Sequence, residues 1–258
     1  GDRAAALYQR IHNRAADFVS IVEQIEQDLG VPVVNKRLAV SPLALIGQHT
    51  DPKVYLELAK AMDQAAKDVR VDYIGGFSAL VHKGNTTSDD ALIAALPEAI
   101  STTERLCGCV NVASSRAGIN MDAVRSMGDV IKDIAERTAD RFGIGCARFV
   151  VFGNAVEDNP FVAGAFHGVG EPEATINIGI SGPGVVRAAL QRLMQDPPPH
   201  LDLGTIADVI KRMAFKTTRA GELVGRVVAA RLGAPIRFGV VDLSLAPTPE
   251  EGDSVAHI

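Results

Sequence analysis

The sequence has 258 residues, of which 47% are hydrophobic and 22% are charged, and its formal net charge is −5. This apolar fraction is typical of a folded domain and excludes an intrinsically disordered chain. The acidic balance argues against a nucleic-acid-binding module, and no apolar stretch is long enough to predict a membrane span. Three cysteines are too few for a disulfide framework, so the sequence predicts a reduced, cytoplasmic protein.

Hydrophobic periodicity and turn residues predict helices that alternate with short strands along the whole chain. Helices are expected over 4–29, 41–46, 51–69, 88–103, 120–141, 182–194 and 203–232. Strands are expected over 31–40, 72–79, 107–113, 148–154, 174–180 and 236–243. The runs at 148–154 and 174–180 are rich in Val and Ile, which is typical of central strands buried on both faces. This alternation predicts a largely parallel sheet or an α/β barrel.

Local signals set several of these boundaries. Gly30 is a typical left-handed helix stop, and Asp51 followed by Pro52 is a typical helix start. Gly75 and Gly76 lie inside a predicted strand, which indicates a β-bulge or a close backbone approach there. The first helix begins without a cap, and residues 252–258 resemble the opening of another helix. We therefore expect the chain to be a piece of a longer protein.

The segment 153–171 is a long polar loop between two predicted strands, and it contains five of the candidate site residues. They are Asn154, Glu157, Asp158, Asn159 and His167, and the loop also carries Glu171. Active sites of α/β folds lie at the carboxyl ends of strands, and such residues suit acid/base catalysis or a hard or borderline cation. The alternative is structural, with Asp158 and Asn159 in turn hydrogen bonds and His167 as a packed histidine.

Two further segments predict anion binding. Ser181, Gly182 and Gly184 form a glycine turn between a strand and a helix, where backbone amides and the helix dipole suit a carboxylate or phosphate. The alternative is a tight turn in which Ser181 caps the helix. Lys36 and Arg37 are adjacent in a strand, so they point to opposite faces, and one should face the interior. Its partner would be a carboxylate of the loop or an anionic ligand, and the alternative is edge-strand charge.

The cysteines allow a minor thiol hypothesis. Cys107 and Cys109 alternate along a strand with both side chains on one face, and Cys146 is distant in sequence. Two thiols are too few for a zinc site on their own. The pattern favours buried small apolar residues, and a nucleophilic or radical thiol at Cys107 or Cys109 is the alternative.

Long motifs together resemble one family. They are NKRLAVSPLALIG, YIGGFSALVHKG, GINMDAV, FGNAVEDNPFVAGAFHGVGE, NIGISGPGVV, FKTTRAGELVGR and VDLSLAPTP-EEGDSVA. In these motifs the chain is similar to the uncharacterised prokaryotic PFL family, a domain of unknown function whose fold is similar to pyruvate formate-lyase and other glycyl-radical enzymes. The resemblance implies a partly open α/β barrel, incomplete in this chain, with residues 1–258 as a single α/β domain.

The resemblance implies no particular reaction. The glycyl-radical enzymes carry an Arg-Val-x-Gly-type loop, which these 258 residues lack. Family members are often encoded beside a small ACT-domain protein, which implies a regulatory alternative.

Our leading hypothesis is a cytoplasmic enzyme that binds a small anionic metabolite. Glu157, Asp158 and His167 would be catalytic or would bind a divalent metal. The ligand-binding residues would be Lys36, Arg37, Asn154, Asn159, Ser181, Gly182 and Gly184. The alternatives are a non-catalytic ligand-binding subunit that works with an ACT-domain protein and a radical or thiol enzyme. A homo-oligomer is a further expectation, whereas a nucleic acid or a membrane is not an expected partner.

Overall fold

The computed structural model describes residues 2–170 and 172–245. The chain divides into two compact units, Gly1–Ala174 and Thr175–Ile258, and each is described here by itself. Glu171 and the helix expected over 252–258 lie outside the described residues. The single domain over 1–258 stays a prediction.

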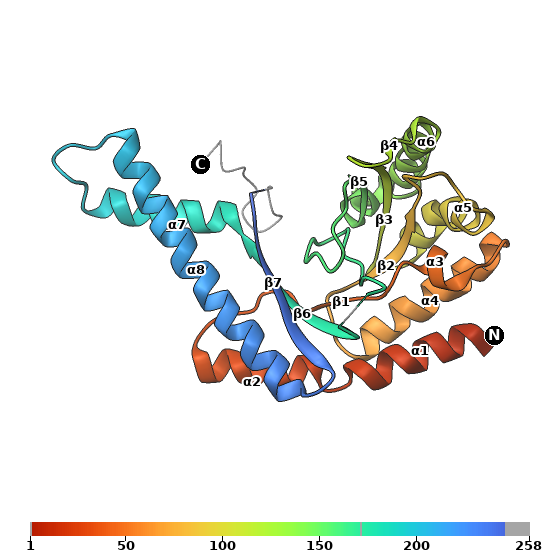
Figure 1. Ribbon diagram of the computed structural model, residues 1–258, viewed down its shortest axis with the longest axis horizontal. Coiled ribbons are helices and arrows are strands. Elements are labelled where there is room, and N and C mark those ends of the chain that lie inside the picture. The colour runs from red at the N-terminus through yellow and green to blue at the C-terminus, as the bar shows by residue number, and fades with distance from the viewer. Residues whose placement is uncertain (1, 171, 246–258) are drawn as a thin grey trace. The chain divides into compact units, whose positions relative to one another are not determined.

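The first unit is a parallel sheet with helices on one face (Figure 1). Its helices are α1 (Asp2–Ala15), α2 (Phe18–Leu29), α3 (Leu43–Gly47), α4 (Pro52–Asp68), α5 (Thr87–Thr102) and α6 (Met121–Arg137), with short 3-10 turns at Ala139–Arg141 and Ile144–Arg148. Its strands are β1 (Arg37–Ala39), β2 (Tyr73–Leu80), β3 (Leu106–Ser114), β4 (Gly118–Ile119) and β5 (Phe149–Gly153). Strands β1, β2, β3 and β5 run parallel in that order, and β4 returns antiparallel against the end of β3.

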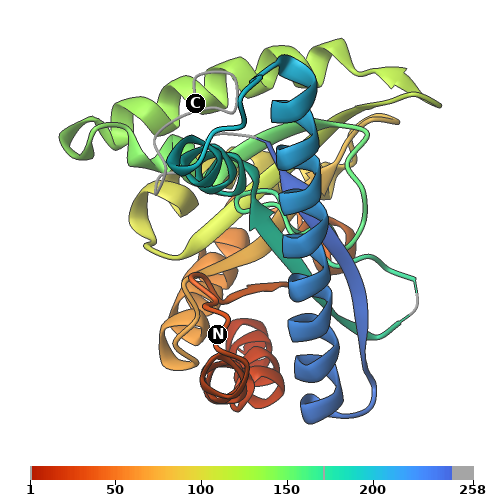
Figure 2. The ribbon, with the colours of Figure 1, turned by 90° about the vertical axis from the view of Figure 1, so that its left-hand side faces the viewer.

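The second unit consists of two strands and two helices. They are β6 (Ala174–Ser181), α7 (Gly182–Gln195), α8 (Leu203–Leu232) and β7 (Ile236–Ser244), and β6 pairs with β7. Gly225 of α8 lies against Phe238 of β7 and Ile178 of β6, so the absence of a side chain there lets the helix sit close to the sheet. Figure 2 shows α8 as one long, uninterrupted helix.

The predicted α/β class with parallel strands is confirmed, whereas the described strands form no closed barrel. The prediction of central strands was wrong for both Val/Ile-rich runs. Among the described residues, β5 pairs only with β3, and β6 pairs only with β7. Side-chain hydrophobicity is similar for a central strand and a half-buried edge strand, so it did not distinguish the two.

Two predicted elements are shorter than expected. The first helix breaks at Ala16–Asp17 into α1 and α2, where Asp17 is a residue type that favours helix starts. The strand expected over 31–40 contains only β1, because side chains take the backbone donors that precede it. Glu26 accepts a hydrogen bond from the Val33 amide (2.7 Å), and Asp72 accepts one from the Lys36 amide (2.7 Å). In the described part of the chain, no helix is long and apolar enough to cross a bilayer.

The expectation for Gly75 and Gly76 is confirmed in both of its forms. The pairing of β2 with β3 shifts register between Ile74 and Phe77, and Gly76 has a left-handed φ of 99°. A Cβ at Gly75 would overlap the carbonyl oxygen of Ala165, and a Cβ at Gly76 would overlap that of Val40. Two other backbone segments therefore lie directly against β2 at these glycines.

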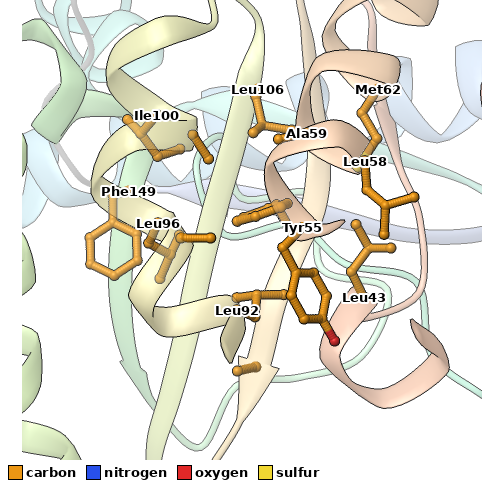
Figure 3. Close-up of a cluster of buried hydrophobic side chains, with 14 of the residues drawn as sticks. Leu43, Tyr55, Leu58, Ala59, Met62, Leu92, Leu96, Ile100, Leu106 and Phe149 are labelled. Atoms are coloured by element: carbon orange, nitrogen blue, oxygen red, sulfur yellow. The ribbon is translucent and has the colours of Figure 1, made fainter. Parts of the chain in front are cut away.

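The core lies between the sheet and helices α4, α5 and α6 (Figure 3). Tyr55 of α4 packs edge-on against Phe77 of β2, with ring centroids 6.3 Å apart, and its hydroxyl lies 2.6 Å from Ser88 Oγ. Leu92 and Leu96 of α5 are fully buried in the same cluster. Burial of these aliphatic and aromatic side chains holds the helix layer on the sheet.

A buried carboxylate joins the helix layer to the sheet. Asp63 of α4 accepts hydrogen bonds from the backbone amides of Glu104 (3.0 Å) and Arg105 (2.6 Å), directly before β3. Its second oxygen is ion-paired with Lys67 at 3.1 Å. Asp63 thus fixes the start of β3 against α4.

We predict that Asp63→Ala lowers the free energy of unfolding by about 1–3 kcal/mol, because it leaves two partly buried amide donors without their acceptor. Chemical denaturation measures this loss. Asp140→Ala is the control, since that carboxylate is exposed and lies 3.8 Å from Arg141, and it should change stability by less than about 0.5 kcal/mol. Equal effects of the two substitutions would contradict the prediction.

Candidate functional site

The loop after β5 covers the face of the sheet that the helices leave uncovered (Figure 1). Gly164 lies against the side chains of Val150 and Phe152, and Phe166 is fully buried. The amide of His167 donates to the carbonyl of Val40, at the carboxyl end of β1 (3.0 Å). The predicted site loop is therefore anchored at the edge of the sheet where sites of parallel α/β folds occur.

Asp158 and His167 form a hydrogen-bonded dyad in this loop. His167 Nδ1 lies 2.7 Å from Asp158 Oδ1, and the amide of Gly168 donates to the same oxygen (2.9 Å). Both side chains are partly exposed. A carboxylate only accepts hydrogen bonds, so Nδ1 must carry the proton. Nε2 is then the ring nitrogen that carries no proton in the neutral ring, and it can accept one.

The backbone holds the dyad in place. The amide of Asp158 donates to the carbonyl of Phe166 (3.1 Å), and Asp158 has a left-handed φ of 57°. Glu157 lies beside Gly168, where a Cβ would overlap its carboxylate. The structure therefore brings together the three residues predicted to be catalytic, and Gly168 provides the space between them.

The two predicted cations, Lys36 and Arg37, contact different parts of the structure, as expected for neighbouring residues of an extended segment. Lys36 forms an ion pair with Glu26 (2.8 Å) and donates to the carbonyl of Val33 (2.6 Å), so its partner is in α2 and not in the loop. The side chain of Arg37 reaches the loop, where it lies 3.4 Å from the Pro160 carbonyl oxygen. Of the two, Arg37 is the cation on the site side of β1.

The asparagines of the loop have structural contacts. Asn154 Oδ1 accepts from the amide of Ser115 (2.6 Å), and its Nδ2 donates to Ser115 Oγ (2.8 Å). Asn159 Oδ1 accepts from the amide of Phe161 (3.1 Å), and its Nδ2 donates to the Val156 carbonyl (2.7 Å). These bonds match the turn-forming alternative that the sequence left open for Asn159.

The glycine turn of the second unit has a packing explanation. Ser181 Oγ accepts from the amide of Gly184 (3.5 Å) and caps α7, as the structural alternative predicted. A Cβ at Gly182 would overlap the carbonyl oxygen of Ser244, so glycine is needed for the close approach of β7. That this turn shares a ligand with the loop of the first unit stays a prediction.

A second polar group lies on the loop side of the sheet, and the sequence did not predict it as part of the site. Asn111 of β3 is buried, and its Nδ2 lies 3.1 Å from His82 Nδ1, directly beyond β2. Its Oδ1 accepts from the amide of Ala155 (3.3 Å), which fixes the orientation of the amide group. His82 Nδ1 therefore accepts a hydrogen bond, and the neutral ring carries its proton on Nε2. The signal for this group in the sequence was Asn111, a polar residue among the apolar residues of a predicted strand.

The thiols beneath the loop are protected. Cys109 donates to Ser78 Oγ (3.1 Å) and lies 3.5 Å from the Gly164 carbonyl oxygen. Burial raises the pKa of Cys107 and the pKa of Cys109 to about 12 each. Both thiols are therefore protonated near neutral pH, which disfavours a nucleophilic role and agrees with buried small residues.

The described residues contain no group of three or more His, Cys, Asp or Glu side chains that could hold a metal ion. Glu157, Asp158 and His167 thus do not form a metal centre among themselves. Their geometry suits proton transfer better, because His167 has its carboxylate partner on Nδ1.

Fold and site together define an α/β protein with a histidine–carboxylate dyad at the carboxyl edge of a parallel sheet. The chain belongs to the family described as Uncharacterised ACR (DUF711), whose model matches residues 2–258. It is 59% identical over 252 residues to a UPF0210 protein of Desulforudis audaxviator and 55% identical over 252 residues to one of Desulforamulus reducens. Each match covers 98% of this chain and 54% of the relative. The chain thus spans about half the length of these relatives.

We predict that only Cys146 reacts with a thiol reagent in the native chain. A pKa near 12 leaves about one thiol in ten thousand ionised at pH 8, whereas Cys146 is only partly buried. Dithionitrobenzoate titration should count one thiol in the native chain and three in guanidinium. Cys146→Ser should abolish the native reaction, and rapid reaction of a second native thiol would contradict the prediction.

Proposed function

We propose that this chain carries the acid/base site of a cytoplasmic enzyme that binds a small anionic metabolite, a carboxylate or a phosphate. The observation that carries the proposal is the Asp158–His167 dyad at the carboxyl edge of the sheet, with its Nδ1 to Oδ1 distance of 2.7 Å. Asp158 fixes the tautomer and the orientation of the imidazole. His167 Nε2 would then take a proton from the bound metabolite or from a water molecule.

Arg37 is the group proposed to attract the anion. Its side chain lies on the loop side of β1, 3.4 Å from the Pro160 carbonyl oxygen. A guanidinium binds carboxylates and phosphates through several N–H donors. Glu157 would add a second carboxylate at the same loop.

His82 is proposed as a neutral hydrogen-bond donor to a bound ligand. Its Nε2 carries the proton, because Asn111 donates to its Nδ1. His82 follows β2, next to β1, whose end binds the amide of His167. The end of β1 lies beside Gly75 and Gly76 within β2, so His82 stands further along the sheet and is a separate candidate donor.

The similarity to pyruvate formate-lyase-like barrels is part of this proposal. The relatives are nearly twice as long as this chain, and their further length would supply the strands that a partly open barrel needs. Asn154 and Asn159 would then support the backbone of the loop more than bind the ligand directly, and Ser181, Gly182 and Gly184 would support the start of α7 in the second unit.

Arg37→Met is predicted to weaken anion binding by about 10- to 100-fold, because a charged hydrogen-bond partner is lost. Titration calorimetry with inorganic phosphate and a panel of two- to six-carbon carboxylates measures the affinity. Lys36→Met is the matched control, since this neighbour points to the other side of β1 and binds Glu26. Equal losses in the two variants would contradict the assignment of Arg37.

His167→Gln is predicted to lower turnover by about 10²- to 10⁴-fold while ligand affinity changes little, as expected for a lost general base. Asp158→Asn should lower turnover in the same direction, because it removes the acceptor for Nδ1–H. His200→Gln is the control, since this histidine lies in the exposed connection between α7 and α8. The substrate for this assay comes from native mass spectrometry of the full-length protein, which also detects any retained metal or partner.

A ligand-binding subunit that works with an ACT-domain protein is the alternative, and the same experiments separate it from the enzyme. It would bind the anion through Arg37, co-purify with the small partner, and show no turnover over the metabolite panel. Loss of binding in Arg37→Met without any turnover in the parent chain would therefore favour the regulatory function.

A further inference from the structure

A hollow of about 360 Å³ lies among the helices of the first unit. Its walls include four aliphatic side chains, which are Leu7 of α1, Leu43 and Ile46 of α3, and Leu58 of α4. Two basic side chains also line it, Arg3 of α1 and His49 just after α3. We call this hollow the helix pocket. Its volume and its combination of apolar walls with a few polar groups are typical of small-molecule sites.

Arg3 has only a neutral partner in the helix pocket. Its Nη1 lies 2.9 Å from Nδ1 of His49. A guanidinium only donates hydrogen bonds, so Nδ1 accepts, and the proton of the neutral ring is on Nε2. Burial and then the charge of Arg3 lower the pKa of His49, which keeps the ring neutral near pH 7. Within residues 2–170 and 172–245, no carboxylate is paired with Arg3, so its charge has no counter-charge there.

Buried groups behind His49 hold the imidazole in position. The amide of His49 donates to Tyr55 Oη (3.4 Å), and the two rings pack edge-on with centroids 5.8 Å apart. Tyr55 is fully buried, and its hydroxyl lies 2.6 Å from Ser88 Oγ, which donates to the carbonyl of Ala44 (2.7 Å). Gln48 ends α3 with a left-handed φ of 48°, a conformation that is uncommon outside glycine. The ring is therefore oriented before any ligand binds, which reduces the cost of binding.

We propose that the helix pocket binds a small aliphatic carboxylate, a monocarboxylate of about four to six carbons. The carboxylate would accept hydrogen bonds from the remaining N–H donors of Arg3 and from Nε2–H of His49. The hydrocarbon chain would lie against the four aliphatic side chains. The guanidinium without a counter-charge selects an anion, and the apolar walls select a hydrocarbon chain over inorganic phosphate.

The helix pocket is formed by different elements from the candidate site. Its lining residues belong to α1, α3, α4 and the turn after α3, whereas the candidate site is carried by β1 and the loop after β5. The proposal therefore does not rest on the proposed function, and either can fail alone.

The first test measures the dependence on chain length. Titration calorimetry of the full-length protein with acetate, butyrate and hexanoate should show affinity rising about 2- to 4-fold per methylene, because each methylene contacts the walls. Inorganic phosphate is the control for charge alone, and it should not compete with hexanoate. Equal affinities for acetate and hexanoate, or no hexanoate binding at millimolar concentration, would overturn the proposal.

The second test removes the charge. Arg3→Met should weaken hexanoate binding by about 10- to 100-fold, because a charged hydrogen-bond donor is lost. Arg10→Met is the matched control, since Arg10 lies two turns further along the same side of α1 and does not line the pocket. Both arginines are exposed, so both variants should keep the fold. Equal effects of the two substitutions would count against the site.

The third test adds an opposing charge. Ile46→Asp should weaken hexanoate binding by at least about 10-fold, because it sets a carboxylate inside the pocket that repels the ligand. Leu45→Asp is the control, since this neighbour is also exposed but does not line the pocket. Unchanged hexanoate affinity in Ile46→Asp would overturn the proposal.

Arg37→Met separates the helix pocket from the candidate site. It should leave hexanoate affinity unchanged, and Arg3→Met should leave any phosphate binding through Arg37 unchanged. Loss of hexanoate binding in Arg37→Met but not in Arg3→Met would overturn the helix pocket and assign this ligand to the candidate site. Hexanoate binding that depends on Arg3, in a protein without any phosphate binding through Arg37, would support the helix pocket and count against the proposed function.

Discussion

The close backbone contact at Gly75 and Gly76 is the constraint on which the candidate site depends. Ala165 of the loop and Val40 beyond β1 place their carbonyl oxygens where side chains of β2 would otherwise stand. Without these contacts the loop could not lie directly on the sheet, and the amide of His167 could not reach the carbonyl of Val40. A side chain at either glycine would lift the loop and separate the dyad from the strand ends. The bulge in β2 is therefore part of the architecture of the site.

Strand alternation then sorts the polar residues of the sheet into two environments. Residues 106, 108, 110 and 112 of β3 face the helix layer, whereas Cys107, Cys109 and Asn111 face the loop. In the same way Lys36 turns to Glu26 while Arg37 turns to the loop. The polar side of the sheet is covered by backbone of the loop, which supplies the Gly164 carbonyl to Cys109 and the Ala155 amide to Asn111. A buried polar layer of this kind is stable only when such partners are present.

The features that the sequence predicted correctly depend on residues that are near one another in the chain. Helix starts at Asp51 and Asn120, the stop at Gly30 and the irregularity at Gly75–Gly76 depend on local backbone preferences, so they were correct. The grouping of Glu157, Asp158 and His167 was also predictable, since one loop carries all three. The pairing of His82 with Asn111 was missed because it joins two strands 29 residues apart. Edge positions of β5 and β6 were missed because the number of neighbouring strands is a property of the whole sheet and not of the strand sequence.

His167 and His82 differ in tautomer because their hydrogen-bond partners differ. Asp158 can only accept, so it requires a proton on Nδ1 of His167 and leaves Nε2 as a base. The amide of Ala155 requires an acceptor and so turns Asn111 Oδ1 toward itself, which leaves Nδ2 to donate to His82. His82 must then carry its proton on Nε2, from which the neutral ring can donate a hydrogen bond. The loop side of the sheet thus holds a proton acceptor at His167 and a hydrogen-bond donor at His82, because a carboxylate orients one ring and an amide orients the other. For the proposed function, this tautomer leaves Nε2 of His167 as the group that would take a proton from the metabolite.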